Sequence, residues 1–254
     1  MIELKFDEEF AVITLSRPEA LNALSFQLIG DIEAAIQSVA KSPARAVLFT
    51  GAGTKAFCAG ADIKELQQRS LLAQREGAAL GQRVFALLDQ LAIPSVALVN
   101  GFAFGGGCEL ALTCTFRLAL ENARFGLPEV KLGLIPGYGG TQRLPRLIGS
   151  GRALEMVMTG RTVAAQEALT IGLVNRIVEA PGLDAAKAFC REFSGYSLRA
   201  LQFAREAVQR GMDTGLHQGL QIEADLSTLA YRTRDAEEGM QAFVEKRKPD
   251  FRDE

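Results

Sequence analysis

The sequence is poor in residue types on which several common kinds of site depend. Its 254 residues include a single histidine, His217, and no tryptophan. A metal site built from several histidines is therefore excluded, and a Ser-His-Asp triad would depend on that one residue. Because His217 lies inside a helical pattern, we expect it on the surface or at an interface.

Cysteine is also scarce. The four cysteines form no C-x-x-C pair, which argues against a zinc knuckle and a thioredoxin-like redox motif. A chain of this length can bury roughly three quarters of its unfolded surface, so it can build a core without disulfide bonds. We therefore expect buried thiols in a reducing compartment. They are Cys58, Cys108, Cys114 and Cys190.

The charges nearly balance, with 28 Lys and Arg against 30 Asp and Glu. This balance gives no global basic excess, so we expect no nucleic-acid partner. No apolar run approaches the roughly 18 residues of a membrane span, so we expect no membrane insertion. The acidic first ten residues fit neither a signal peptide nor a transit peptide. The sequence thus predicts a soluble cytoplasmic protein.

Strand and helix patterns alternate through the first two thirds of the chain. Apolar residues at helical spacing predict a helix over 25–41, which Pro43 closes. Short β-branched or apolar runs predict strands over 10–15, 45–50, 95–99 and 116–120. The alternation argues for an α/β fold with mainly parallel strands.

Helical patterns dominate from about Ser150, leaving one strand candidate at 173–178. Asp235, with Glu238 three residues later, predicts the start of the last helix. We therefore divide the chain into a core of residues 1–195 and a helical region of residues 196–254. A helical region of this length must pack on the core or on a neighbouring subunit.

Glycines mark four candidate loops. Two of them, 51–53 and 137–140, lack the third glycine of a dinucleotide fingerprint, so we expect tight turns there. The other two, 57–64 and 105–110, lead into helices, whose first N–H groups have no internal partner. If these two loops face each other, two amide N–H groups can bind one oxygen as an oxyanion hole. Ordinary strand-to-helix turns are the alternative.

Two glutamates, Glu109 and Glu129, lie in otherwise apolar stretches. Poor solvation raises the pKa of a carboxyl group, and two carboxyl groups in different environments can serve as acid and base. The alternative is one glutamate at a helix start and another in a surface loop.

Five motifs follow one another along nearly the whole chain. They are RPEALNAL at 17–24, AFCAGADIKE at 56–65, VNGFAFGGGCEL at 99–110, ARFGLPEV at 123–130 and LGLIPGYGGTQRL at 132–144, with KRKPDF at 246–251 as a further typical segment. Together they resemble the crotonase family, also called the enoyl-CoA hydratase/isomerase family. Any one could arise by chance, but five in the family's order and spacing are highly specific.

The resemblance implies an α/β, crotonase-like spiral of repeated ββα units with a C-terminal helical trimerisation region. It implies a homotrimer, or a hexamer made as a dimer of trimers, and an acyl-CoA substrate. No metal or redox cofactor is expected, since coenzyme A is part of the substrate. Family members commonly have Asp where Thr115 follows Cys114, and we expect this departure to bear on local structure and subunit packing.

The resemblance also assigns site residues. The backbone N–H groups of Ala61 and Gly106 would form the oxyanion hole. Glu109 and Glu129 match the two glutamates of hydratases. From the chemistry of water addition we assign Glu109 to water activation and Glu129 to the proton-donor side. The residues expected to bind substrate and coenzyme A are Ala23, Leu24, Ala59, Ala61, Asp62, Ile63, Lys64 and Gly106.

The predicted function is that of an enoyl-CoA hydratase, which converts trans-2-enoyl-CoA to 3-hydroxyacyl-CoA. A Δ3-Δ2 enoyl-CoA isomerase, or another crotonase-type acyl-CoA enzyme, is the first alternative. A non-catalytic acyl-CoA-binding or RNA-associated protein is the second.

Overall fold

The computed structural model describes residues 1–254, which form two units. The first unit comprises residues 1–91 and 95–188, and the second comprises residues 92–94 and 189–254. None of the helices combines the length and apolar character that crossing a membrane requires.

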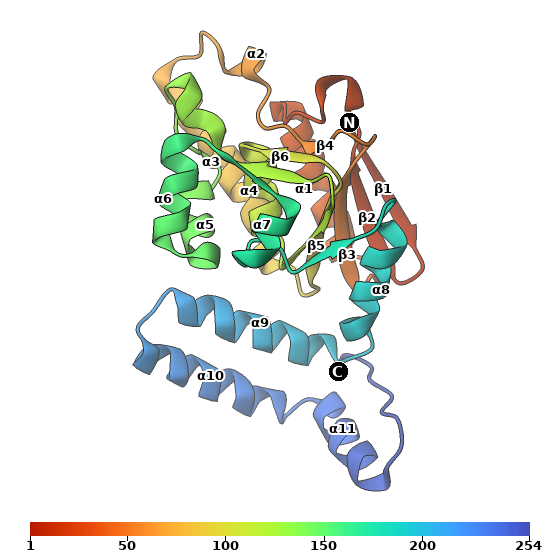
Figure 1. The fold of residues 1–254 in the computed structure, drawn as a ribbon. Coiled ribbons are helices and arrows are strands. Elements are labelled where there is room, and N and C mark those ends of the chain that lie inside the picture. Colours follow the sequence, from red (N-terminus) through yellow and green to blue (C-terminus); the bar gives the residue numbers. More distant parts are fainter. The chain divides into compact units, whose positions relative to one another are not determined.

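A six-stranded sheet forms the centre of the first unit (Figure 1). In spatial order its strands are β1 (Ile2–Asp7), β2 (Phe10–Leu15), β3 (Ala46–Gly51), β5 (Ser95–Val99), β7 (Phe116–Leu120) and β10 (Arg176–Val178). Only β1 is antiparallel to its neighbour, and all other pairs are parallel. The central strand β5 is buried along its whole length, as expected of a parallel strand covered on both faces.

A second sheet has four short strands. They are β4 (Ala56–Cys58), β6 (Phe102–Phe104), β8 (Arg124–Gly126) and β9 (Thr162–Ala164), in that spatial order. The pairs β3–β4, β5–β6 and β7–β8 each place one strand in the large sheet and the next in the small sheet. Because helices follow each pair, the chain advances by repeated ββα steps, which confirms the predicted fold class.

Helices complete the first unit. Those after the strand pairs are α2 (Ile63–Leu66) and α3 (Leu71–Gln90), then α4 (Gly106–Thr113), then the 3₁₀ helix η2 (Pro128–Leu132) with α5 (Gly140–Ile148). The others are η1 (Pro18–Ala20), α1 (Phe26–Ala40), α6 (Ser150–Thr159) and α7 (Ala165–Thr170). The helix predicted over 25–41 is α1, whose N-cap Ser25 accepts a hydrogen bond from the Leu28 N–H.

Thr115 lies between α4 and β7 and is hydrogen-bonded to Ser95 at the start of β5. The Thr115 N–H donates to Ser95 Oγ at 3.0 Å, and the Ser95 N–H donates to Thr115 Oγ1 at 3.2 Å. These reciprocal bonds satisfy two backbone donors at strand ends. Thr115 thus contributes to local structure, as expected from its departure from the family pattern.

The second unit is helical. The chain enters it within α8 (Leu183–Ser194) and continues through α9 (Leu198–Met212), α10 (Leu216–Ala230) and α11 (Arg234–Glu245). Helices α9 and α10 run side by side (Figure 1), and they approach closely where Gly211 meets Gly219. Arg205 Nη1 donates to the Ile93 carbonyl oxygen at 2.9 Å, which ties residues 92–94 to this unit.

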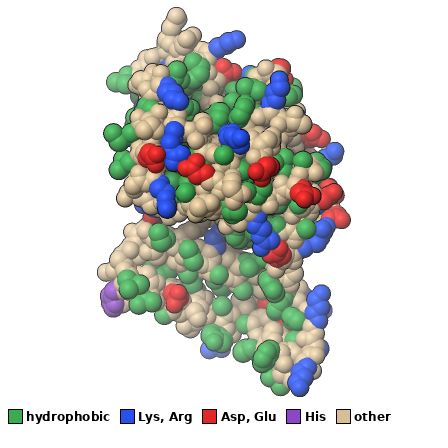
Figure 2. Space-filling view, in the orientation of Figure 1, with side chains coloured by type: hydrophobic (Ala, Val, Ile, Leu, Met, Phe, Trp, Pro, Cys, Tyr) green, Lys and Arg blue, Asp and Glu red, His purple; other side chains and the backbone are tan.

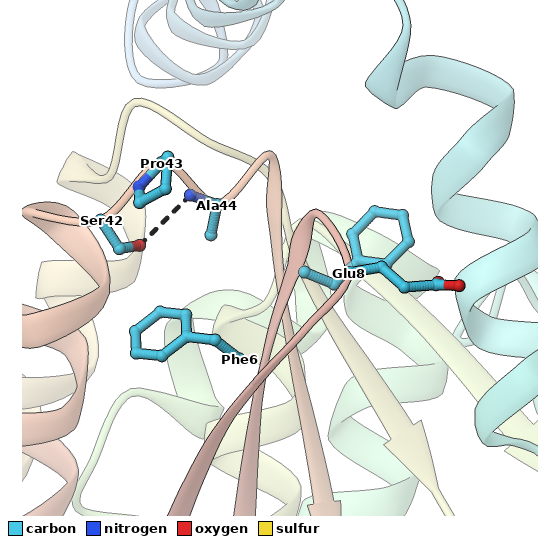
Figure 3. Close-up of a pocket in the computed structure, with 6 residues that line it drawn as sticks. Phe6, Glu8, Ser42, Pro43 and Ala44 are labelled. Carbon is cyan, nitrogen blue, oxygen red and sulfur yellow. Dashed lines mark hydrogen bonds between the residues drawn. The ribbon is translucent and has the colours of Figure 1, made fainter.

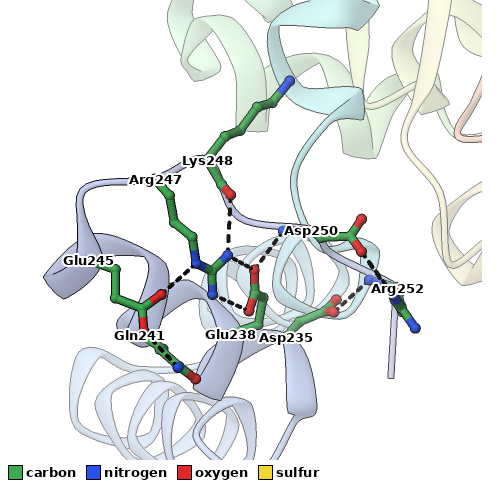
Figure 4. A network of polar contacts seen from close by, with 8 residues as sticks. All are labelled: Asp235, Glu238, Gln241, Glu245, Arg247, Lys248, Asp250 and Arg252. Carbon is green, nitrogen blue, oxygen red and sulfur yellow. Dashed lines mark hydrogen bonds and ion pairs between the residues drawn. The ribbon is translucent and has the colours of Figure 1, made fainter.

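The prediction that Asp235 starts the last helix is wrong. Thr233 is the N-cap of α11, and its hydroxyl accepts from the Ala236 N–H at 3.1 Å. The buried Asp235 carboxylate instead accepts from the Arg252 N–H at 2.7 Å (Figure 4). It also accepts from the Asp253 N–H at 2.9 Å. The Asp235 carboxylate therefore binds the backbone of the C-terminal segment and does not form the N-terminal cap of α11 that the sequence pattern predicts.

Candidate functional site

Two glycine-bearing loops face each other at the ends of β4 and β6. The backbone φ angle is +107° at Gly60 and +48° at Gly105, a region that residues with a β-carbon rarely adopt. A β-carbon placed on Gly105 would lie 3.7 Å from the Gly60 Cα. The two loops are therefore in backbone contact, which the sequence left open.

The residues after these glycines carry unpaired N–H groups. Leu24 bridges to the first loop, since its N–H donates to the Gly60 carbonyl and its carbonyl accepts from the Asp62 N–H, both at 2.8 Å. This bridge uses the groups on either side of Ala61 and leaves the Ala61 N–H without an acceptor. The Gly106 N–H also has none, because Gly106 is the first residue of α4.

The start of α4 packs directly on β4 and on two side chains. A β-carbon on Gly107 would collide with the Cys58 carbonyl oxygen. One on Gly106 would lie 3.0 Å from both Leu24 Cδ1 and Tyr138 Cδ2. Glycine at these two positions lets the helix N-terminus reach the first loop.

Glu109 lies in the first turn of α4, with its side chain 1% exposed. Its Oε1 accepts from the Tyr138 N–H at 2.8 Å and the Gly140 N–H at 2.7 Å. Gly140 begins α5, so the carboxylate lies at a helix N-terminus, where negative charge is favoured. Burial nevertheless raises the pKa of Glu109 to about 7, against the lowering effect of these hydrogen bonds, and the nearby charge of Glu129 adds to the rise.

Glu129 lies in η2 and is half-buried. Its Oε1 is 3.1 Å from the position that a β-carbon on Gly105 would take, so the carboxyl group adjoins the second loop. Its Oε2 is buried without a hydrogen-bond partner, which is uncommon for a polar atom in a folded protein. Burial also raises the pKa of Glu129. This carboxyl group can therefore hold a proton or bind an incoming polar atom.

The expected coenzyme A segments are tied to each other. Arg17 Nη1 donates to the Ala23 carbonyl at 2.9 Å, and Arg17 Nη2 pairs with Asp62 Oδ2 at 3.2 Å. The Ala59 N–H donates to the Leu21 carbonyl at 3.0 Å. The structure thereby brings Ala23, Leu24, Ala59, Ala61, Asp62 and Gly106 together, whereas the side chains of Ile63 and Lys64 are exposed on α2.

The sequence analysis missed the residues that hold Glu109. The stretch 137–140 was expected to form only a tight turn, and Gly139, with φ of +120°, does adopt a turn conformation. The N–H groups on either side of it, of Tyr138 and Gly140, also bind the carboxylate. A signal was available, since Gly140 precedes a helical pattern and the first N–H groups of a helix lack internal partners.

The thiols beside the two loops are not nucleophiles. Burial raises the pKa of both Cys58 and Cys108 to about 12, so both are neutral at physiological pH. Both thiols are buried, as the sequence analysis expected. No three His, Cys, Asp or Glu side chains gather in a geometry that could hold a metal ion.

Two surface pockets lie apart from these residues. One, drawn in Figure 3, is lined by Phe6, Glu8, Phe10, Ser42, Pro43 and Ala44, of which only Glu8 carries a charge. The other, about 980 Å³, lies at the carboxyl ends of β3, β5, β7 and β10. Neither contains a candidate site residue.

Comparisons with known proteins agree with this geometry. The family model described as Enoyl-CoA hydratase/isomerase matches residues 5–254. The chain is 46% identical over 253 residues to the crotonyl-CoA hydratase of Syntrophomonas wolfei, covering 98% of this chain and 97% of that protein. It is 42% identical to the short-chain-enoyl-CoA hydratase of Clostridium acetobutylicum, covering 96% and 95% of the two chains. The crystal structure of an enoyl-CoA hydratase from Bacillus anthracis superimposes with a TM-score of 0.94 at 40% identity, covering 100% of this chain and 99% of that one.

Proposed function

Because the chain belongs to the enoyl-CoA hydratase/isomerase family, we propose that it adds water across the 2,3 double bond of a trans-2-enoyl-CoA thioester. Its activity is that of an enoyl-CoA hydratase, and its product is a 3-hydroxyacyl-CoA. One observation carries the proposal: two carboxyl groups, of Glu109 and Glu129, adjoin two facing loops that carry unpaired N–H groups.

The N–H groups of Ala61 and Gly106 bind the thioester oxygen in this proposal. As water adds to Cβ, negative charge builds on that oxygen as an enolate. Fixed N–H dipoles stabilise this charge without reorganising, and one such donor is commonly worth about 10² to 10³ in rate. The contact between Gly60 and Gly105 supports the assignment, because Ala61 and Gly106 directly follow these two glycines.

The two carboxyl groups divide the proton transfers. Ionised Glu109 accepts a proton from the attacking water while the water oxygen bonds to Cβ. Protonated Glu129 donates a proton to Cα, so the net change is the addition of one water molecule. A pKa of about 7 leaves much of Glu109 ionised near neutral pH, and the unpaired Oε2 of Glu129 is available to a reacting group. Since the two groups interact electrostatically, they titrate as a pair. The reaction requires no metal or redox cofactor.

We also propose that the enzyme is a homotrimer or a dimer of trimers. Figure 2 shows hydrophobic side chains on the surface of the C-terminal helices. On these helices Leu216, Phe243 and Val244 are at least 80% exposed, and large exposed apolar surfaces mark interaction sites. Sedimentation analysis of the purified chain tests this, and a monomer at micromolar concentration would contradict it.

Four free, buried thiols support a reducing compartment, for which we propose the cytoplasm.

The decisive experiment follows the loss of the conjugated-thioester ultraviolet absorbance of crotonyl-CoA. Wild type is compared with Glu109→Gln and Glu129→Gln, each checked for folding by circular dichroism. We expect rapid loss with wild type and a rate lower by about 10² to 10⁴ with each variant. A wild-type protein that binds 2-enoyl-CoA thioesters without changing their absorbance would overturn the hydratase proposal.

A further inference from the structure

The ring of Tyr138 is wedged between α3 and the start of α4. A β-carbon on Gly81, in α3, would collide with one edge of the ring, and one on Gly106 would lie 3.0 Å from the other edge. Phe85, one turn after Gly81, meets the ring edge-on, with centroids 5.7 Å apart and planes at 80°. Tyr138 is only 8% exposed, so its ring fills this space rather than pointing into solvent.

The same residue adjoins both parts of the proposed site. Its backbone N–H holds Glu109 at 2.8 Å, and its ring lies against Gly106, whose N–H is a proposed oxyanion donor. A bound thioester places its carbonyl oxygen at Gly106 and its Cα and Cβ at the carboxyl groups. Because Tyr138 contacts both Glu109 and Gly106, its loop borders the space next to Cβ, into which the further carbons of the acyl chain extend in this proposal.

The ring is held in place from both sides of the loop. Gln82 Nε2, in α3, donates to the Gly137 carbonyl at 2.8 Å. Arg143, in α5, makes a two-point ion pair with Asp89, with Nη1 to Oδ1 at 3.2 Å. These contacts fasten the chain before and after Tyr138 to the helix on which its ring packs. Moving the backbone of this loop away from α3 would break both connections.

We infer that the Tyr138 ring limits the length of the acyl chain and makes the site selective for short-chain 2-enoyl-CoA thioesters. This inference rests on the proposed hydratase function and adds the substrate class to it. The glycines at 81 and 106 support this inference, because a side chain at either position would occupy the space that the Tyr138 ring fills.

The test measures kcat/KM for 2-enoyl-CoA thioesters of four, six, eight and ten acyl carbons. Tyr138→Ala removes the ring, whereas Tyr138→Phe keeps it and serves as the matched control. For wild type and Tyr138→Phe we expect a steep fall beyond the chain length that the ring permits. One methylene group in a fitted apolar pocket changes discrimination by about tenfold or more. The eight-carbon to four-carbon ratio should therefore rise at least about tenfold in Tyr138→Ala.

Gly81→Ala provides a test in the opposite direction. Its β-carbon would push the ring away from α3 and towards the site, so the six-carbon to four-carbon ratio should fall below that of wild type. Tyr138→Leu, which leaves a smaller cavity, replaces Tyr138→Ala if the latter does not fold.

The outcomes separate this inference from the proposed function. If wild type hydrates the four-carbon and ten-carbon substrates equally well, or if ring removal leaves the ratios unchanged, the inference is wrong and the hydratase function stands. If wild type hydrates none of the four substrates, the proposed function itself fails.

Discussion

The carboxylate of Glu109 and the backbone N–H of Gly140 are joined by a 2.7 Å hydrogen bond. This bond links the first turn of α4 to the first turn of α5, and it fixes which oxygen of the carboxylate remains available. Oε1 is occupied by two N–H donors, so Oε2 is the oxygen that can meet a water molecule. The orientation of the Glu109 carboxylate, the proposed base, therefore depends in part on the backbone N–H of Gly140.

Gly140→Ala adds only one methyl group, but it should reduce the hydratase activity substantially. The added β-carbon would lie 3.1 Å from Glu109 Oε1 and 3.0 Å from Leu127 Cδ1, so either the carboxylate or the helix start must shift. We expect kcat for crotonyl-CoA hydration to fall about 10- to 100-fold, because a displacement of about 1 Å is costly in catalysis.

Gly137→Ala is the matched control for this change. Gly137 lies in the same loop, its φ is not positive, and a β-carbon there would meet nothing within 4 Å. Its kcat should stay within about twofold of wild type. An equal fall in kcat in the two variants would show that any change in this loop lowers activity, and that the contact of residue 140 with Glu109 is not the cause.

The raised pKa of Glu109 predicts a pH dependence of catalysis. Because Glu109 must be ionised to accept a proton, kcat/KM should fall as the pH drops through about 7. Burial raises the pKa of Glu129 as well, which favours the protonated form that donates a proton. The pH profile of crotonyl-CoA hydration should therefore show an acidic limb. Glu109→Gln should lose the acidic limb, and retention of that limb would assign it to another group.

The same shift predicts a pH dependence of stability. The pKa of Glu109 is raised from 4.5 to about 7 in the folded state, so the folded protein binds more protons than the unfolded chain between these values. The free energy of unfolding therefore decreases as the pH rises through this window, by up to about 3 kcal/mol. Urea unfolding at several pH values measures it. Glu109→Gln should flatten the dependence, and an unchanged slope would contradict the assignment.

Sequence patterns predict the parts of this fold that are long and locally determined. The helix over 25–41 was correct because Leu28, Ile32 and Ile36 all face the core and Ser25 caps the first turn. The family and fold class were also confirmed, since matching motifs run along nearly the whole chain. The strands of the small sheet have three residues each, which is too short for an alternating pattern, and all four were missed.

The candidate site was predictable in its parts but not in its assembly. Each glycine loop could be found from its place before a helix, and each glutamate from its apolar neighbours. The contact of Gly60 with Gly105 depends on the parallel pairing of β4 with β6, which includes a register shift between Ala56 and Cys58. Similarly, the partners of Glu109 lie in a loop that only tertiary packing brings to it.

Gly107→Ala should destabilise the fold rather than only the reaction. Its β-carbon would collide with the Cys58 backbone, which cannot move without disturbing β4. We expect the free energy of unfolding to fall by about 3 kcal/mol, as for severe overpacking. Gly30→Ala in α1 is the control, because a β-carbon there meets nothing within 4 Å and alanine favours the helix by about 0.5–1 kcal/mol. Thermal unfolding compares them, and equal stability of Gly107→Ala and wild type would refute the close packing.

Asp235→Ala should release the C-terminal segment from α11. The buried carboxylate accepts two backbone N–H groups, of Arg252 and Asp253, and hydrogen bonds to a charged acceptor are worth about 1.5–3 kcal/mol each. A second anchor remains, because Arg247 pairs with Glu238 and Glu238 also accepts from the Asp250 N–H at 2.8 Å (Figure 4). Amide hydrogen exchange should therefore accelerate at residues 252–253 and less at 250. Glu237→Ala, an exposed neighbour on α11, should leave exchange unchanged. Unaltered exchange in Asp235→Ala would mean that other contacts hold this segment.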